Sequence, residues 1–144
     1  MSIIVEFFAA PDDASAALVP PTGPGPAFES LSFGNFDAEE ALIEWECWFS
    51  GVAFEELVDA DKPRHVAGPD DDGPVVLALS PRLSAALAGA GPDQVRDAAV
   101  AWSTQRAEDG EVIDTEIAGV ILGDLAALAG RARRQGRSLY CWVA

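Results

Sequence analysis

The sequence predicts an α+β fold: a single compact domain in which a small mixed or antiparallel sheet, containing both terminal strands, is covered by about four to five helices. Strand-like apolar segments lie near the two ends, and helix-like segments fill most of the chain between them. The chain has 144 residues, a length that fits one domain burying about two-thirds of its unfolded surface. Because 49% of the residues are hydrophobic, the composition also argues against disorder.

The first elements are short. Ser2–Phe8 is β-branched and aromatic and stops at Pro11, as expected for a buried strand. Ala14–Leu18 is predicted to be a short helix, because a proline and two aspartates precede it. Residues 19–27 are rich in Pro and Gly and predict a surface loop within the domain, since too few residues precede them to form a core.

The next segments alternate in type. Phe28–Phe36 is ambiguous and fits a short strand, whereas Asp37 begins a capping-box pattern that predicts a helix to about Ser50, ending at Gly51. A second helix is predicted at Ala53–Asp59, and an edge strand at Arg64–Ala67.

The second half of the chain is mostly helical. Val75–Leu79 reads as a buried strand, and Ser80–Pro81 marks the start of a helix that continues to Leu87. Further helices are predicted from Pro92 to about Glu108 and from Asp114 to about Gln135, before a last strand at Ser138–Val143. The expected apolar stripes are Val95, Ala98, Ala99 and Trp102 on the first of these helices, and Ile117, Val120, Ile121, Leu125 and Leu128 on the second. Gly119 and Gly123 lie four residues apart on the second helix, where they would permit close approach of a neighbour.

The charge distribution constrains the partners. The chain carries 24 Asp and Glu against nine Lys and Arg, a net charge of −15 that disfavours nucleic acid and anionic membranes and favours a basic protein. The exception is a cluster formed by Arg131, Arg133, Arg134 and Arg137. Cations at the end of a helix complement the dipole and need no ligand, although a phosphate or nucleic-acid site there is the alternative.

The sequence also predicts a compartment. No apolar run approaches the roughly 20 residues that span a bilayer, and the first ten residues do not resemble an export signal. Two cysteines, Cys47 and Cys141, lie among aromatic residues and do not form a disulfide framework. A cytoplasmic protein is therefore expected.

Motifs for catalysis, metals or cofactors are sparse, so we predict no catalytic residue, no metal site and no cofactor. His65 is the only histidine, and no Ser or Cys at a suitable spacing supports it. The run Asp70–Gly73 lacks the alternation of a calcium loop and is interpreted as a solvated turn. Cys47 is expected to be an inert, packed thiol.

One helix carries the predicted binding residues. Trp45 and Trp48 stand three residues apart among acids, so either both indoles enter the core or one stays at the surface beside carboxylates. An aromatic and acidic surface of this kind would bind a basic protein. The predicted set is Glu40, Glu44, Trp45, Glu46 and Trp48.

Several segments in this order resemble the YfbM-like domains of unknown function. They are the opening Met1–Phe8, the Trp-bearing helix ending Phe49-Ser50-Gly51, Val75–Leu79 running into Ser80-Pro81, and the helix Ile117–Gln135 followed by Gly136–Trp142. In those domains the Trp-bearing helix also carries a His, which is absent here. The interval between the Trp and the turn that ends the helix is also longer in those domains than in this chain. The resemblance implies a compact α/β domain of bacterial cytoplasm with no established activity, and it transfers no catalytic residue.

Two functions remain open. The first is a non-catalytic acidic binding protein, such as an immunity or antitoxin-like protein that covers a basic partner. The second is a small-molecule or enzymatic site in a cleft beside the Pro/Gly loop, with Glu6, Trp142 or His65 near it. Carboxylates gathered on one convex face favour the first, and carboxylates converging with an aromatic residue in a pocket favour the second.

Overall fold

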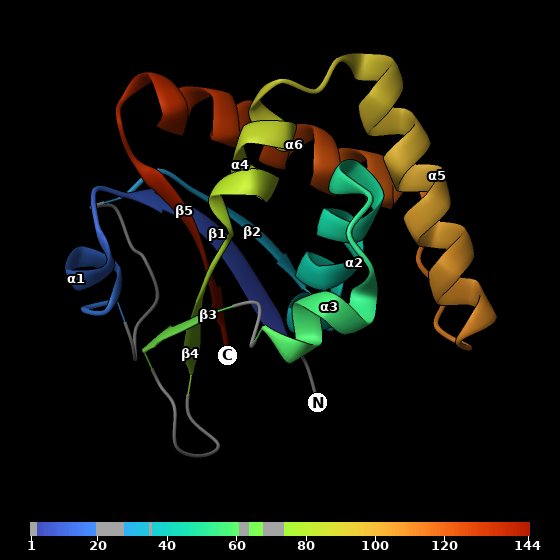
Figure 1. Cartoon of the computed structure of the whole chain (residues 1–144), viewed down its shortest axis with the longest axis horizontal. Helices are drawn as coiled ribbons and strands as arrows, with labels where there is room; N and C mark the ends of the chain where they lie inside the picture. The colour runs from blue at the N-terminus through green and yellow to red at the C-terminus, as the bar shows by residue number, and fades with distance from the viewer. Residues whose placement is uncertain (1–2, 20–27, 35, 61–63, 68–73) are drawn as a thin grey trace.

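The structure is a computed structural model that describes residues 3–19, 28–34, 36–60, 64–67 and 74–144. These residues form an α+β domain with a five-stranded antiparallel sheet and six helices (Figure 1). The strands are β1 (Ile4–Ala10), β2 (Ser30–Gly34), β3 (Arg64–Ala67), β4 (Val75–Ala78) and β5 (Ser138–Val143). The helices are α1 (Asp13–Ala16), α2 (Ala38–Ser50), α3 (Phe54–Asp59), α4 (Pro81–Ala88), α5 (Pro92–Glu108) and α6 (Thr115–Arg134).

The two strands nearest the ends of the chain meet at the centre of the sheet. The strand order is β2-β1-β5-β4-β3, so β5 pairs with β1 on one side and with β4 on the other. Cys141 is the register partner of both Phe7 and Leu77. The predicted presence of both terminal strands in one sheet is therefore confirmed.

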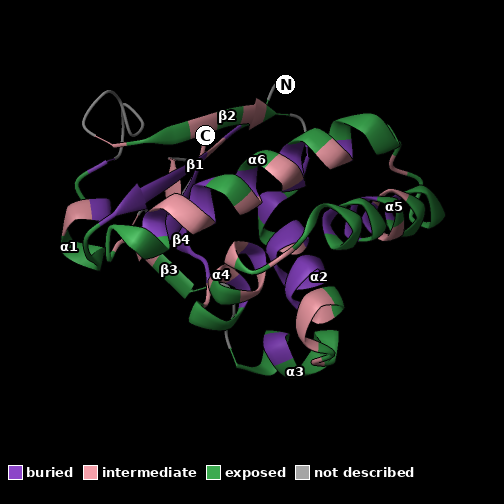
Figure 2. Cartoon of the chain, turned by 90° about the horizontal axis from the view of Figure 1, so that it is seen from above, coloured by how far each residue is buried: buried purple, intermediate pink, exposed green. Residues whose placement is uncertain are grey.

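Side-chain alternation along the strands divides the core between the two faces of the sheet. One face is covered by α2, α4, α5 and α6 and forms the larger core, to which Phe7, Leu77 and Leu139 belong. Phe8, Val76 and Tyr140 point to the other face, where they pack with Ala16 of α1. Figure 2 shows the buried stretches of the ribbon in purple.

Local signals in the sequence placed the helix ends. The Asp37 side chain accepts the N–H of Glu40, and the Ser80 hydroxyl accepts the N–H of Leu83. Gly51 ends α2 with a φ of 75°, a conformation that glycine adopts without a steric penalty. These caps confirm the starts of α2 and α4 and the end of α2.

The expected stripe of α6 is only partly correct. Ile121, Leu125 and Leu128 are buried in the larger core, as predicted, but Ile117 and Val120 are more than half exposed. The buried stripe is rotated about the helix axis relative to the predicted one, so that Ala118 and Leu122 are buried in place of Ile117 and Val120. On α5, by contrast, the predicted stripe from Val95 to Trp102 is buried throughout.

Two expected surface segments fall largely or wholly outside the described residues. Of the loop 19–27, residues 20–27 are not described, while Val19 is buried against the second face of the sheet. The Asp70–Gly73 turn is also outside them. In the part of the chain that is described, no helix has the length and apolarity needed to cross a membrane.

Candidate functional site

The predicted binding residues on α2 do not share one surface. Trp45, Glu44 and Glu46 are buried, and Glu40 is half-buried. Only Trp48 is exposed, with 39% of its surface accessible. The expectation that Glu44 and Glu46 face solvent is therefore wrong, and of the two indoles one enters the core while the other stays at the surface.

The buried Glu44 is held by an arginine from α5. Arg106 is only 5% exposed, and its Nη2 lies 2.7 Å from a Glu44 oxygen and 3.1 Å from a Glu40 oxygen. Asp109 and Glu111 complete the group, at 2.5 Å from Nη2 and 3.3 Å from Nη1. A guanidinium with several donors in a fixed plane can satisfy several carboxylates at once. This carboxylate–Arg106 cluster thus joins α2 to α5.

Burial and charge act in opposite directions within the cluster. Desolvation raises the pKa of Glu44, against the lowering effect of Arg106. For Arg106, burial opposes the charged form, but the neighbouring carboxylates outweigh it and raise the pKa of the guanidinium. Burial therefore opposes the ionisation of Glu44, and Arg106 favours it.

The same carboxylates have the spacing of a cation site. Oxygens of Glu40, Glu44 and Asp109 lie within 4.8 Å of one another, close enough to share a metal ion. However, Nη2 of Arg106 bonds to all three, so the positive charge at their centre comes from the protein. The cluster is best explained as a structural ion network rather than as a metal centre.

Aromatic residues also pack at the contact between α2 and α5. Trp45 and Trp102 pack edge to face, with ring centroids 5.0 Å apart, and Phe36 contacts both. Among the described residues no hydrogen-bond partner is found for either indole nitrogen, for Arg106 Nε or for Glu44 Oε1. Carboxylates and aromatics both lie at the contact between α2 and α5, but the carboxylates are engaged by Arg106 of the protein itself.

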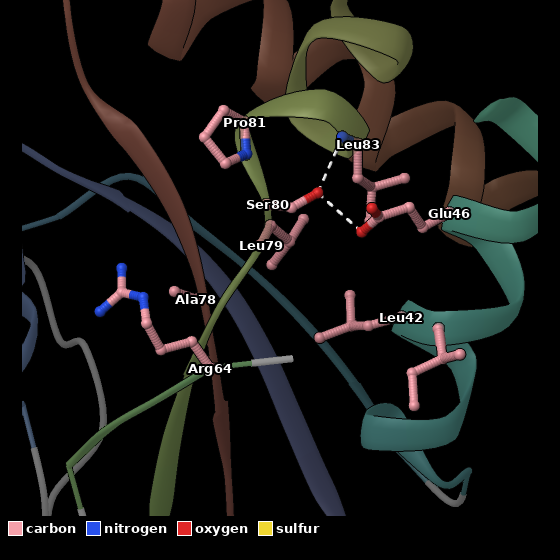
Figure 3. Close-up of a pocket in the computed structure, with 9 residues that line it drawn as sticks. Leu42, Glu46, Arg64, Ala78, Leu79, Ser80, Pro81 and Leu83 are labelled. Atoms are coloured by element: carbon pink, nitrogen blue, oxygen red, sulfur yellow. Dashed lines mark hydrogen bonds between the residues drawn. The ribbon is translucent and has the colours of Figure 1, made fainter. Parts of the chain in front are cut away.

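Glu46 contributes to a small pocket at the start of α4 (Figure 3). One of its oxygens accepts the Ser80 hydroxyl at 2.7 Å, while the same hydroxyl caps α4 by accepting the N–H of Leu83. The other oxygen lies 3.9 Å from Arg82. A cavity of about 40 Å³ has room for little more than one water molecule. Glu46 therefore occupies the positive end of α4 itself, where an external anion would otherwise be favoured.

On the other face of the sheet, Asp13 connects α1 to β3 and β5. It binds the Arg64 guanidinium at 2.7 Å and accepts the Tyr140 hydroxyl at 2.7 Å. These hydrogen bonds lower the pKa of Asp13, whereas burial and the adjacent carboxylate raise the pKa of Tyr140 to about 12. A phenol kept protonated in this way acts as a hydrogen-bond donor that fixes α1 on the sheet.

The residues of the predicted cleft are not brought together. Glu6 and Trp142 are register partners on β1 and β5. His65 lies on the edge strand β3, roughly 14 Å away from β1 at the usual spacing between strands. It pairs with Leu77, which faces the helices, whereas Trp142 belongs to the opposite face. The described residues therefore assemble no site from Glu6, Trp142 and His65.

An exposed acidic and apolar surface lies on α3, where the sequence interpretation proposed no site. Only Leu57 of this helix is buried. Phe54 and Val58 are 40% and 47% exposed, and Glu55, Glu56 and Asp59 are exposed between and beside them. We call these five residues the α3 surface. The sequence signal for this surface was the presence of large apolar residues among acids over six positions. However, a short helix with a single core residue resembles an ordinary connecting helix.

The remaining candidates are accounted for by packing. Cys141 is buried, and Cys47 is half-buried. Desolvation is the main cause that raises the pKa of the Cys47 thiol, and the negative charges of Glu46 and Glu44 raise it further. In the arginine cluster, Arg131 pairs with Glu29, and three of the arginines lie in the last turn of α6, where they complement the helix dipole.

Comparison with known proteins leaves the resemblance to YfbM-like domains as a prediction. No protein family, no curated protein and no solved structure matches this chain.

Proposed function

We propose that this protein is a non-catalytic binding module of the bacterial cytoplasm that covers a basic partner protein, in the manner of an immunity protein or antitoxin. The observation that carries the proposal is the α3 surface, where two apolar side chains are exposed among three carboxylates. The net charge of −15 supplies a long-range field of the same sign. A basic protein with a small apolar patch is the partner that complements both features.

A difference between the acids of α2 and those of α3 supports this choice of surface. Within the protein, Glu44 of α2 is bound by Arg106 and Glu46 of α2 is bound by Ser80. By contrast, Glu55, Glu56 and Asp59 form no ion pair with any described residue. The acids of α3 remain available for a partner.

The partner is to be recovered from native lysate, identified, purified and tested directly for binding. Replacing Glu55 and Glu56 by Gln and Asp59 by Asn should slow association by about tenfold at low salt, because complementary charges speed encounter. The matched control removes three exposed acids elsewhere: Asp97→Asn, Glu108→Gln and Asp124→Asn. This control changes the net charge equally and should have a clearly smaller effect.

A second variant separates contact from steering. Phe54→Ser with Val58→Ser should speed dissociation while leaving association nearly unchanged, since apolar contacts act mainly on the lifetime of a complex. The proposal fails if the partner is acidic, if association is indifferent to salt, or if the α3 and control variants slow it equally.

A further inference from the structure

A groove of about 930 Å³ runs between α5 and α6, on a part of the molecule that the proposed function does not use. Its surface is made mostly of small or short apolar side chains. Those that matter here are Gly119, Gly123, Ala127 and Gly130 of α6 and Ala99 and Val100 of α5.

The groove is not explained by the packing of this chain. A Cβ atom built on Gly119 or Gly123 would have nothing within 4 Å, so these glycines do not make room for α5. The close neighbour expected from their spacing is absent among the described residues. Beside them Val100 and Val120 leave about half of their surfaces exposed, at 47% and 56%. Glycine lowers helix stability, so glycines in an exposed helix face with no internal partner require another reason.

Opposite charges lie at the two ends of the groove. Glu116 lines it at the start of α6, and Arg134 lines it about 27 Å further along the helix axis. Both are exposed, and neither forms an ion pair with a described residue. Arg96 and Arg131 also line the groove, but they pair with Asp93 and Glu29 of the same chain. The places of Glu116 and Arg134 suit the helix dipole, but the dipole does not account for the small residues between them.

The order of residues along α6 is self-complementary about Leu125. Glu116 and Arg134 are equally far from this point, as are Val120 and Gly130, and Gly123 and Ala127. When two identical helices cross antiparallel at this level, each residue meets its counterpart on the other helix. An acid then faces an arginine at both ends, and a valine faces a glycine.

We propose that this groove is the interface of a homodimer, in which α6 of a second copy lies antiparallel in it. Glu116 then pairs with the partner's Arg134, Val120 fits over the partner's Gly130, and Gly123 meets the partner's Ala127. Charge complementarity selects a second copy over a basic peptide, which would meet Arg134 at one end. The net charge of each copy opposes association, but at physiological ionic strength the Debye length of about 8 Å limits this repulsion.

The first test is steric. The full-length chain should sediment as a dimer at physiological ionic strength, with a dissociation constant measured by sedimentation equilibrium. Gly123→Leu should raise that constant about tenfold to a hundredfold by overfilling the interface. The open space around its Cβ leaves the folded monomer intact, which circular dichroism checks. Gln94→Leu, an exposed position of α5 outside the groove, is the control and should leave the dimer unchanged.

The second test is electrostatic and does not depend on the first. Arg134→Glu alone and Glu116→Arg alone should each weaken the dimer, because like charges then face each other at both ends. The double variant restores opposite charges in the proposed pairing and should recover the wild-type dissociation constant. A purely structural role of either residue predicts additive losses instead.

Three results would overturn the dimer. They are a chain that stays monomeric throughout the concentration range, a dimer that tolerates Gly123→Leu, and a double charge variant that is no tighter than the single variants. A groove that binds a small amphiphile in a monomeric chain would assign it to a ligand in place of a second copy.

Discussion

Helix α5 contacts two neighbours in opposite ways. Toward α2 it presents Trp102 and Arg106, which fill the interface with aromatic rings and a buried ion network. Toward α6 it presents Ala99, which is buried in the core, and Val100, which is half exposed and lines the groove beside this contact. The first contact gains from large side chains but must neutralise a buried carboxylate, whereas the second is made of small residues, needs no such compensation and leaves a groove open beside it.

The comparison shows which residues at the contacts of α5 are needed to hold the fold together and which are not. An acid buried at the filled contact is committed to the fold, because removing its arginine would leave it unpaired in a region of low dielectric. The glycines that line the groove, Gly119 and Gly123, make no such commitment, so small substitutions at these two positions should cost the folded monomer little. Stability experiments on α5 and α6 can break or sharpen this contrast.

The largest effect is expected at the filled contact. Arg106→Ala should lower the free energy of unfolding by about 3–5 kcal/mol, since it leaves Glu44 buried without its countercharge. Urea denaturation followed by fluorescence measures the change. The exposed pair of Arg96 with Asp93 provides the control, and Arg96→Ala should cost less than about 1 kcal/mol.

The pH dependence of that loss has a definite sign. Burial already raises the pKa of Glu44 above its ordinary value, so the folded state holds this proton more tightly than the unfolded state, and ionisation costs stability as pH rises through the interval between the two pKa values. Without Arg106 the folded pKa rises further. The deficit of Arg106→Ala should therefore shrink on acidification toward the ordinary Glu pKa. A deficit that is constant between neutral and mildly acidic pH would contradict this assignment.

A smaller but still large effect separates the two sides of α6. Truncating Ile121 or Leu125 to Ala should cost about 2–5 kcal/mol, because both lie in the larger core against the sheet. Val120→Ala, on the exposed side, should cost less than about 0.5 kcal/mol in dilute, monomeric protein. Equal losses for Val120 and Leu125 would show that the two faces of α6 are not distinguished as described.

The smallest effect has the opposite sign. Gly119→Ala should stabilise the dilute monomer by about 0.5–1 kcal/mol, because alanine has the higher helix propensity and its Cβ meets open space. Thermal denaturation at low protein concentration checks the shift. Destabilisation by this substitution would mean that the groove is closed in solution.

Most of the fold followed from local signals, and most of the site did not. Asp37, Gly51 and Ser80 act within a few residues of their own helix, so caps and ends were readable from the sequence. The burial of Glu44 depends on Arg106, 62 residues later, and no local pattern announces such a partner. The predicted stripe of α6 includes Ile117 and Val120 because they are strongly apolar, whereas the residue that faces the core at this level is the small Ala118.

The position of β5 has a consequence for how the chain reaches its native state. Of the five strands of this sheet, β5 is synthesised last and lies between β1 and β4, so the centre of the sheet is missing until synthesis of β5 is complete. The helices α4, α5 and α6 are local and can form early, whereas pairing β1 with β5 closes nearly the whole chain into one loop. The sheet should therefore assemble only after β5 has been synthesised, and a nascent chain that stalls before Ser138 should expose the edges of β1 and β4 to chaperones or to other chains.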